Sequence, residues 1–266
     1  MATKTKVVPI TAGKPTGTAV VVKKTGSNVV SIMDALRAQA AAVTDKTAPA
    51  SGNAIRVTQD KQFILPDGTK TPGPLELVIV DFASKNTFYE RAFDPKAITP
   101  PACFSLGSNP LKMVPSNNAP LKQAEDCSAC PMNQFGSDGD GKACKNSRVL
   151  AVLPPKAYDK DGNLITEVED MQMWTLATSP TANKGFDGFV TSVARIFQLP
   201  PVGVFATVGF DPSVTYAKLV FSNPQANPDV GEYFARQAEA RAMLAVEPDV
   251  SQYKSAAPAK KAVGRR

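Results

Sequence analysis

The stretch PLELVIVDFAS, residues 74–84, decides the fold. Its apolar residues run without interruption from Leu77 to Val80, with Leu75 two positions earlier. A short continuous apolar run of this kind is typical of a strand that is covered on both sides. We therefore predict a strand here that is buried on both faces, with further strands around it.

Sequence patterns on either side of this run predict a mainly β chain of about seven strands and three helices. The other predicted strands lie in residues 54–68 (two short strands closed by a turn at 66–68), 86–94 (at hairpin distance from the central run), 147–155, 169–179, 202–211 and 214–223, with a hairpin tip over 158–165. The predicted helices lie in residues 27–43, 181–199 and 227–247.

This order of elements predicts an α+β fold that is mainly β with flanking helices. Short strands, a helix interposed between them and long loops fit an oligonucleotide-binding (OB-like) antiparallel barrel. Residues 95–146 interrupt the pattern with almost no apolar periodicity, and an insertion of that length needs its own means of becoming ordered. We predict one domain over residues 29–253, with this insertion inside it.

The chain has a net charge of +6, which is unevenly distributed. Residues 1–28 and 254–266 each carry five lysines or arginines and no acid, so residues 29–253 have a net charge of −4. Both ends have the composition of disordered tails. Basic tails can attract phosphates, and they can also serve only to keep a protein in solution.

The sequence also bears on the compartment. It contains no run of 18 apolar residues and no signal-peptide core near Met1, which predicts a protein that stays in the cytoplasm and does not enter the membrane. Thiols stay reduced in that compartment. The four cysteines are therefore expected to serve as ligands and not to form disulfides.

The four cysteines lie within the insertion, as Cys103, Cys127-x2-Cys130 and Cys144. Zinc in a structural site takes four ligands in a tetrahedron, and thiolates suit it well. The set therefore predicts a structural Zn²⁺ site, with Phe104 and Phe135 expected to cover it. An iron–sulfur cluster uses the same four thiolates and stays an alternative, as does a pair of disulfides.

Several catalytic and ligand-binding motifs are excluded. Gly136-x4-Gly141-Lys142-Ala143 resembles a phosphate loop but lacks the Ser or Thr that holds magnesium. The chain has no histidine, which excludes Ser-His-Asp and Cys-His systems and the zinc deaminases. We therefore expect no enzymatic activity.

Six residues are candidates for contact with single-stranded nucleic acid, because such sites combine cations along a groove with aromatic stacking platforms. They are Tyr89, Arg91 and Trp174, expected to meet bases from the barrel face, and Lys142, Lys145 and Arg148, expected to hold phosphates beside Cys144.

The runs FILPDG, LELVIVDFASKNTFYERAFDP, CSACPMNQFGSDGDGKACKNSRVLAVL and YAKLVFSN resemble bacteriophage single-stranded DNA-binding proteins with a zinc-type cysteine loop, over roughly residues 28–247. The resemblance implies an oligonucleotide-binding fold, a role in phage DNA replication or recombination in the host cytoplasm, and Cys103, Cys127, Cys130 and Cys144 as metal ligands. The basic end SAAPAKKAVGRR departs from the acidic tail common among such proteins.

The expected function is therefore that of a phage protein that protects and organises single-stranded DNA, with replication or recombination proteins as further partners and with oligomers allowed. The alternative is a virion or assembly protein with a zinc-stapled loop.

Overall fold

The computed structural model describes residues 52–254, apart from residues 93 and 95–97. The predicted tails, residues 1–28 and 254–266, and the predicted helix over 27–43 lie outside the described residues, except for Lys254. No helix in the described part of the chain is both long and apolar enough to cross a bilayer.

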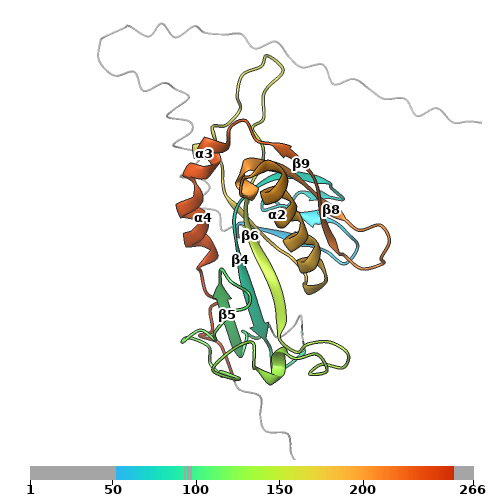
Figure 1. Cartoon of the computed structure of the whole chain (residues 1–266), viewed down its shortest axis with the longest axis vertical. Coiled ribbons are helices and arrows are strands. Elements are labelled where there is room, and N and C mark those ends of the chain that lie inside the picture. The colour runs from blue at the N-terminus through green and yellow to red at the C-terminus, as the bar shows by residue number, and fades with distance from the viewer. Residues whose placement is uncertain (1–51, 93, 95–97, 255–266) are drawn as a thin grey trace, which may run out of the picture. The chain divides into compact units, whose positions relative to one another are not determined.

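The described residues form one curled, mixed sheet of nine strands that makes a half-barrel (Figure 1). The strand order is β3-β2-β1-β7-β6-β4-β8-β9, with β5 also paired to β4. The strands are β1 (Ala54–Val57), β2 (Phe63–Ile64), β3 (Lys70–Thr71), β4 (Leu75–Phe88), β5 (Cys103–Gly107), β6 (Lys145–Leu153), β7 (Trp174–Ala177), β8 (Val204–Phe210) and β9 (Leu219–Ala226). The mainly β prediction is confirmed at this level.

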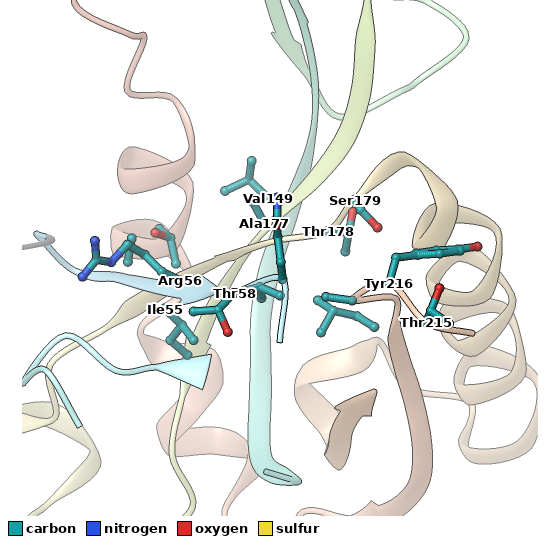
Figure 2. Close-up of a pocket in the computed structure, with 15 residues that line it drawn as sticks. Ile55, Arg56, Thr58, Val149, Ala177, Thr178, Ser179, Thr215 and Tyr216 are labelled. Carbon is teal, nitrogen blue, oxygen red and sulfur yellow. The ribbon is translucent and has the colours of Figure 1, made fainter. Parts of the chain in front are cut away.

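One pair of strands departs from the predicted antiparallel arrangement. β1 runs parallel to β7, and only Ala54 with Thr175 and Ile55 with Leu176 are in register. Beyond Leu176, the edge of β7 has no strand partner on that side among the described residues (Figure 2).

The central strand β4 is confirmed, and it is longer than predicted. It spans 14 residues, pairs with β6 along most of its length, and receives β8 and then β5 on its other side. A separate hairpin strand over 86–94 is therefore wrong, because Asn86–Phe88 continue β4. The strand partner is β5, whose residues were assigned to the irregular insertion.

A β-bulge in β4 changes which residues face which side. The register with β6 passes from Ile79 opposite Val152 to Asp81 opposite Ala151, so that Val80 is an extra residue. A bulge of this kind shifts the alternation of side chains by one position. Lys85 consequently projects from the same face as Val78, and Ser84 from the same face as Ile79.

Helices cover both faces of the sheet. The 15-residue helix α2 (Asn183–Phe197) covers one face, while α3 (Val230–Ala235) and α4 (Gln237–Leu244) cover the other (Figure 1). Four short 3-10 helices accompany them: Pro131–Asn133, Val168–Asp170, Pro180–Ala182 and Pro201–Gly203.

The single helix predicted over 227–247 is broken at Arg236, which lies between α3 and α4. The guanidinium of Arg236 donates hydrogen bonds to three backbone carbonyls, those of Val168, Glu169 (2.9 Å) and Met171 (3.1 Å). These bonds hold the break between α3 and α4 against the turn at Val168–Asp170.

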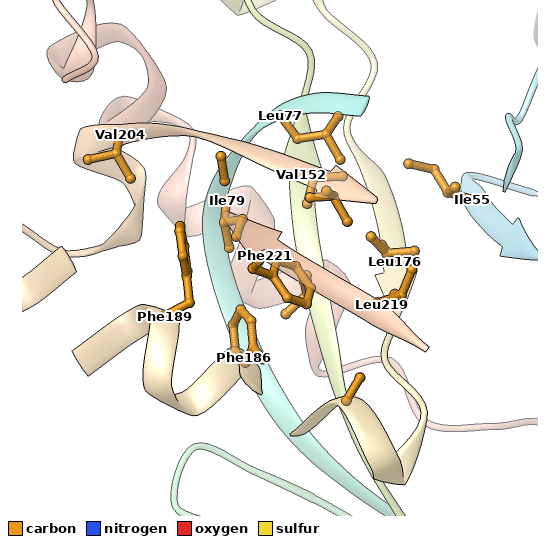
Figure 3. Close-up of a cluster of buried hydrophobic side chains, with 14 of the residues drawn as sticks. Ile55, Leu77, Ile79, Val152, Leu176, Phe186, Phe189, Val204, Leu219 and Phe221 are labelled. Carbon is orange, nitrogen blue, oxygen red and sulfur yellow. The ribbon is translucent and has the colours of Figure 1, made fainter. Parts of the chain in front are cut away.

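The larger core lies between the sheet and α2 (Figure 3). Its centre is aromatic: the ring centroid of Phe186 is 5.1 Å from that of Phe82 and 5.0 Å from that of Phe221, both in edge-on geometry. On the opposite face a second core includes Val78, Leu153 and Tyr233. The apolar run in β4 contributes to both cores, as its continuity predicts.

Replacing Phe186 by Ala should lower the free energy of unfolding by about 3–5 kcal/mol, because a fully buried ring leaves a cavity in a close-packed core. Urea denaturation followed by circular dichroism measures this change. The matched control is Ile196→Ala on the same helix, where the side chain is 70% exposed. We expect its effect to stay within about 0.5 kcal/mol. Equal effects of the two substitutions would contradict the position of α2.

Candidate nucleic-acid interface and cysteine cluster

The insertion that contains the cysteines is anchored by the central ladder. Cys103 opens β5 and pairs with Phe88 at the end of β4, and Cys144 immediately precedes β6. Two of the four cysteines are thus positioned by regular strand pairing. Cys127 and Cys130 lie in the loop between β5 and β6.

Backbone hydrogen bonds bring this loop back to the strands. The Cys144 amide donates to the Met132 carbonyl at 2.8 Å, and the Cys127 amide donates to the Met113 carbonyl at 3.1 Å. The side-chain amide of Asn133 donates to the Cys127 carbonyl at 2.7 Å, which closes the Cys-x2-Cys turn. Asn133 is a residue that sequence analysis did not single out.

All four cysteines are free thiols, all are buried, and all line one cavity of about 10 Å³, roughly the volume of a single water-sized sphere. Burial, together with a smaller effect of the nearby Cys127, Cys130 and Cys103, raises the pKa of Cys144 to about 12. Burial likewise raises the pKa of Cys103. The four sulfurs therefore lie near enough to one another to interact electrostatically.

The cysteine cluster fits a structural zinc ion in part. The donor set fits, because four thiols and no competing carboxylate surround one small space. The arrangement does not yet amount to a coordination sphere: among the described residues, no three His, Cys, Asp or Glu side chains are placed to hold a metal ion. The two-disulfide alternative is not what the structure contains.

The two phenylalanines of the insertion have different environments. Phe104 is 1% exposed and packs with Cys103 and Ala119, so it covers the cluster as predicted. Phe135 is 79% exposed, and the expectation that it also covers the cluster is wrong. The ammonium of Lys142 lies 5.0 Å from the centroid of the Phe135 ring, in cation–π geometry.

Four of the six predicted nucleic-acid contacts lie at the insertion end of the sheet. Tyr89 and Arg91 follow the end of β4 and are exposed, and Lys142 is half-buried beside Phe135. Lys145 is exposed and pairs with Asp138 at 2.8 Å, a surface ion pair that contributes little to stability.

Arg148 is not available to hold phosphate as predicted. Its guanidinium is buried against α2, where Nε and Nη2 donate to the two carboxylate oxygens of Asp187 at 3.1 and 2.7 Å. Arg148 is close to Lys145 in sequence, but in β6 it projects into the body of the protein. We correct its assignment to a structural ion pair that fixes α2 on the sheet.

The side chain of Trp174 also packs against the interior of the protein. Its ring is half-buried against the α2-side core, and its Nε1 is buried without a hydrogen-bond partner among the described residues. The expected outward stacking on bases finds no support in this position.

A larger groove lies at the open edge of β7, and we call it the edge groove. It has a volume of about 960 Å³ and is lined by β1, by the end of β7 and by the loop between β8 and β9. Figure 2 shows Arg56 on one side and Tyr216 on the other, with Ala177, Thr178 and Ser179 between them. The ring of Tyr216 is 50% exposed.

The polarity of the edge groove sets it apart from the rest of the domain. None of the described residues that line it is Asp or Glu, whereas residues 29–253 together carry more acids than bases. It offers a cation, an aromatic ring and several threonine hydroxyls. Arg56 and Tyr216 were missed because the groove joins segments far apart in sequence. Tyr216 was predicted inside a strand over 214–223, whereas the structure places it in the loop between β8 and β9.

No protein-family model, no curated protein and no solved structure matches this chain. We therefore infer its function from the residues and geometry of the edge groove and the cysteine cluster.

The Arg148–Asp187 pair yields a stability prediction. Asp187→Ala should lower the free energy of unfolding by about 1–3 kcal/mol, because it leaves a buried guanidinium without its acceptor. Chemical denaturation measures the change, with the exposed Asp161→Ala as the control. A variant as stable as the unmodified protein would show that this ion pair does not fix α2.

Proposed function

We propose that the protein is a phage-encoded single-stranded DNA-binding protein with an OB-like half-barrel and a structural zinc site. The observation that carries the proposal is a wide groove without acidic side chains at a sheet edge of a net acidic domain. A polyanion is repelled by most of such a surface and is accepted where carboxylates are missing. Replication or recombination of phage DNA in the host cytoplasm is the proposed setting, on the strength of the sequence resemblance.

The groove offers the contacts that single strands require. Sequence-tolerant binding combines phosphate contacts with stacking of bases on aromatic rings, at about 1–3 kcal/mol per base. Tyr216 supplies a ring, Arg56 a guanidinium, and Ser179 and Thr215 hydroxyl groups. A duplex keeps its bases stacked inside and cannot use the ring in this way, so we expect preference for single strands.

The proposed role of zinc is to order the insertion. Cys103, Cys127, Cys130 and Cys144 would hold the ion, which would bind the loop to the ends of β4 and β6. Lys142, Lys145 and Phe135 project from that loop and would then form a second, outer contact surface for the strand, with Tyr89 and Arg91 beside it.

A specific feature also favours the second candidate, a virion or assembly protein. The insertion exposes Leu111 (82%), Val114 (60%) and Phe135 (79%), and such side chains suit contact with another protein. High copy number in purified particles, together with no affinity for DNA, would favour this function over the first.

Tyr216→Ala should weaken binding to oligothymidylate by about 1–3 kcal/mol, the contribution of one stacked base. Fluorescence anisotropy at low salt measures the affinity. The control is Tyr158→Ala, since Tyr158 is 58% exposed at the tip of the hairpin around Gly162 and lies outside the groove.

Salt and strandedness complete this test. Binding of the unmodified protein should fall steeply as salt rises, because neutralised phosphates release counterions. A duplex of the same length should bind more weakly. No binding to single strands at low salt would exclude the proposed function.

Cys130→Ser should lower the zinc content and increase proteolysis between residues 103 and 144, because metal binding provides folding free energy to such a loop. Native mass spectrometry and limited trypsin digestion measure the two effects. Ser128→Ala, an exposed neighbour in the same turn, is the control and should keep both properties. Purified protein without bound metal, or with an unchanged digestion pattern in the variant, would contradict the site.

A further inference from the structure

A second cavity, which we call the Lys85 chamber, opens on the face of the sheet covered by α4. Its volume is about 480 Å³, and its walls come from β4, β5 and the end of α4. The walls are largely apolar, with Leu106 on β5 and Met243, Leu244 and Val246 at the end of α4. Lys85 is the only charged side chain among the described residues that line it.

Lys85 has an unusual environment for a lysine. It is half-buried, and burial lowers the pKa of its ammonium group. Among residues 52–254, apart from 93 and 95–97, no carboxylate forms an ion pair with it. Lysines are rarely buried without a partner, because the charge loses its water shell. An anion that enters the chamber would stabilise the charged ammonium group and so offset the loss of its water shell.

The chamber and the edge groove are adjacent. Ala54, Val149 and Thr175 line both cavities. Val149 packs with the core on the α4 side, so the shared wall lies on the face from which Lys85 projects. We call the two adjacent spaces together the trough; Tyr216 lines one of them and Lys85 the other. None of the described residues along its whole length is acidic.

We propose that the trough is the path of the DNA strand and that Lys85 holds one of its phosphates at the far end from Tyr216. This inference rests on the proposed function and deepens it. Arg56 and Lys85 are the only charged side chains among the described residues that line the two cavities. The apolar walls around the ammonium strengthen its attraction for a phosphate, because fewer waters screen the pair.

The bulge in β4 explains why sequence reasoning did not find Lys85. Under strict alternation, Lys85 shares a face with Leu77 and Ile79 and would point into the α2-side core. The extra residue at Val80 turns it toward the α4 side.

The test compares Lys85→Met with Lys85→Arg. Methionine keeps the aliphatic length in an apolar chamber and removes the charge, so the fold should be retained, and a thermal melt checks this. At low salt, Lys85→Met should weaken oligothymidylate binding about tenfold, as expected for one lost charge-assisted contact. Its salt slope should fall by about 0.7, the value for one phosphate of a single strand. Lys85→Arg should retain most of the affinity.

The control is Lys160→Met, an exposed lysine at the hairpin tip that lines neither cavity. If the unmodified protein binds and Lys85→Met binds equally well with the same salt slope, the path to Lys85 is wrong while the proposed function stands. If the unmodified protein does not bind single strands at all, the proposed function fails and the assignment of Lys85 fails with it.

Discussion

The antiparallel ladder between β4 and β6 is the constraint on which the rest of the structure depends. The end of the ladder near Val78 supplies side chains to both hydrophobic cores. The end near Thr87 carries the cysteine insertion, through Cys103 and Cys144. The backbone hydrogen bonds of the ladder hold both ends of the cysteine insertion in place, although the insertion has few apolar contacts of its own. The insertion is therefore an extension of the sheet, and no separate domain is needed to explain it.

The bulge at Val80 changes the pattern of side chains along this ladder, with two register pairs on its N-terminal side in β4 and seven on its C-terminal side. From Leu77 to Val80, both faces of β4 are apolar. On the C-terminal side of the bulge, polar residues enter the face that α2 covers, where Arg148 pairs with Asp187. Lys85 enters the other face, and no carboxylate in the described part of the chain forms an ion pair with it. A single extra residue thus places Lys85 on the face of the sheet opposite to that of Arg148.

Much of the fold was predictable from the sequence, because the apolar runs that mark β4, β6, β8, β9 and α2 are local signals. The continuity of β4 through Lys85 into Asn86–Phe88 and the short β5 were missed, since these segments have few apolar residues and become strands through pairing with their neighbours. The four cysteines were grouped correctly around one space, although their placement as metal ligands stays a prediction. Arg148 was misassigned because nearness in sequence to Cys144 says nothing about the face of β6 on which a side chain lies. The groove and Lys85 had no local signal, because they depend on strand order and on the register shift.

The parallel pairing of β1 with β7 has a consequence for access. Two residue pairs join these strands, and Ala177 at the end of β7 has no partner in β1 in the described part of the chain. The edge groove lies beside this short pairing, so a polymer that binds there as proposed can enter it sideways. A ligand would not have to be threaded from a terminus, so closed circles and gaps between duplexes would be accepted as readily as linear fragments.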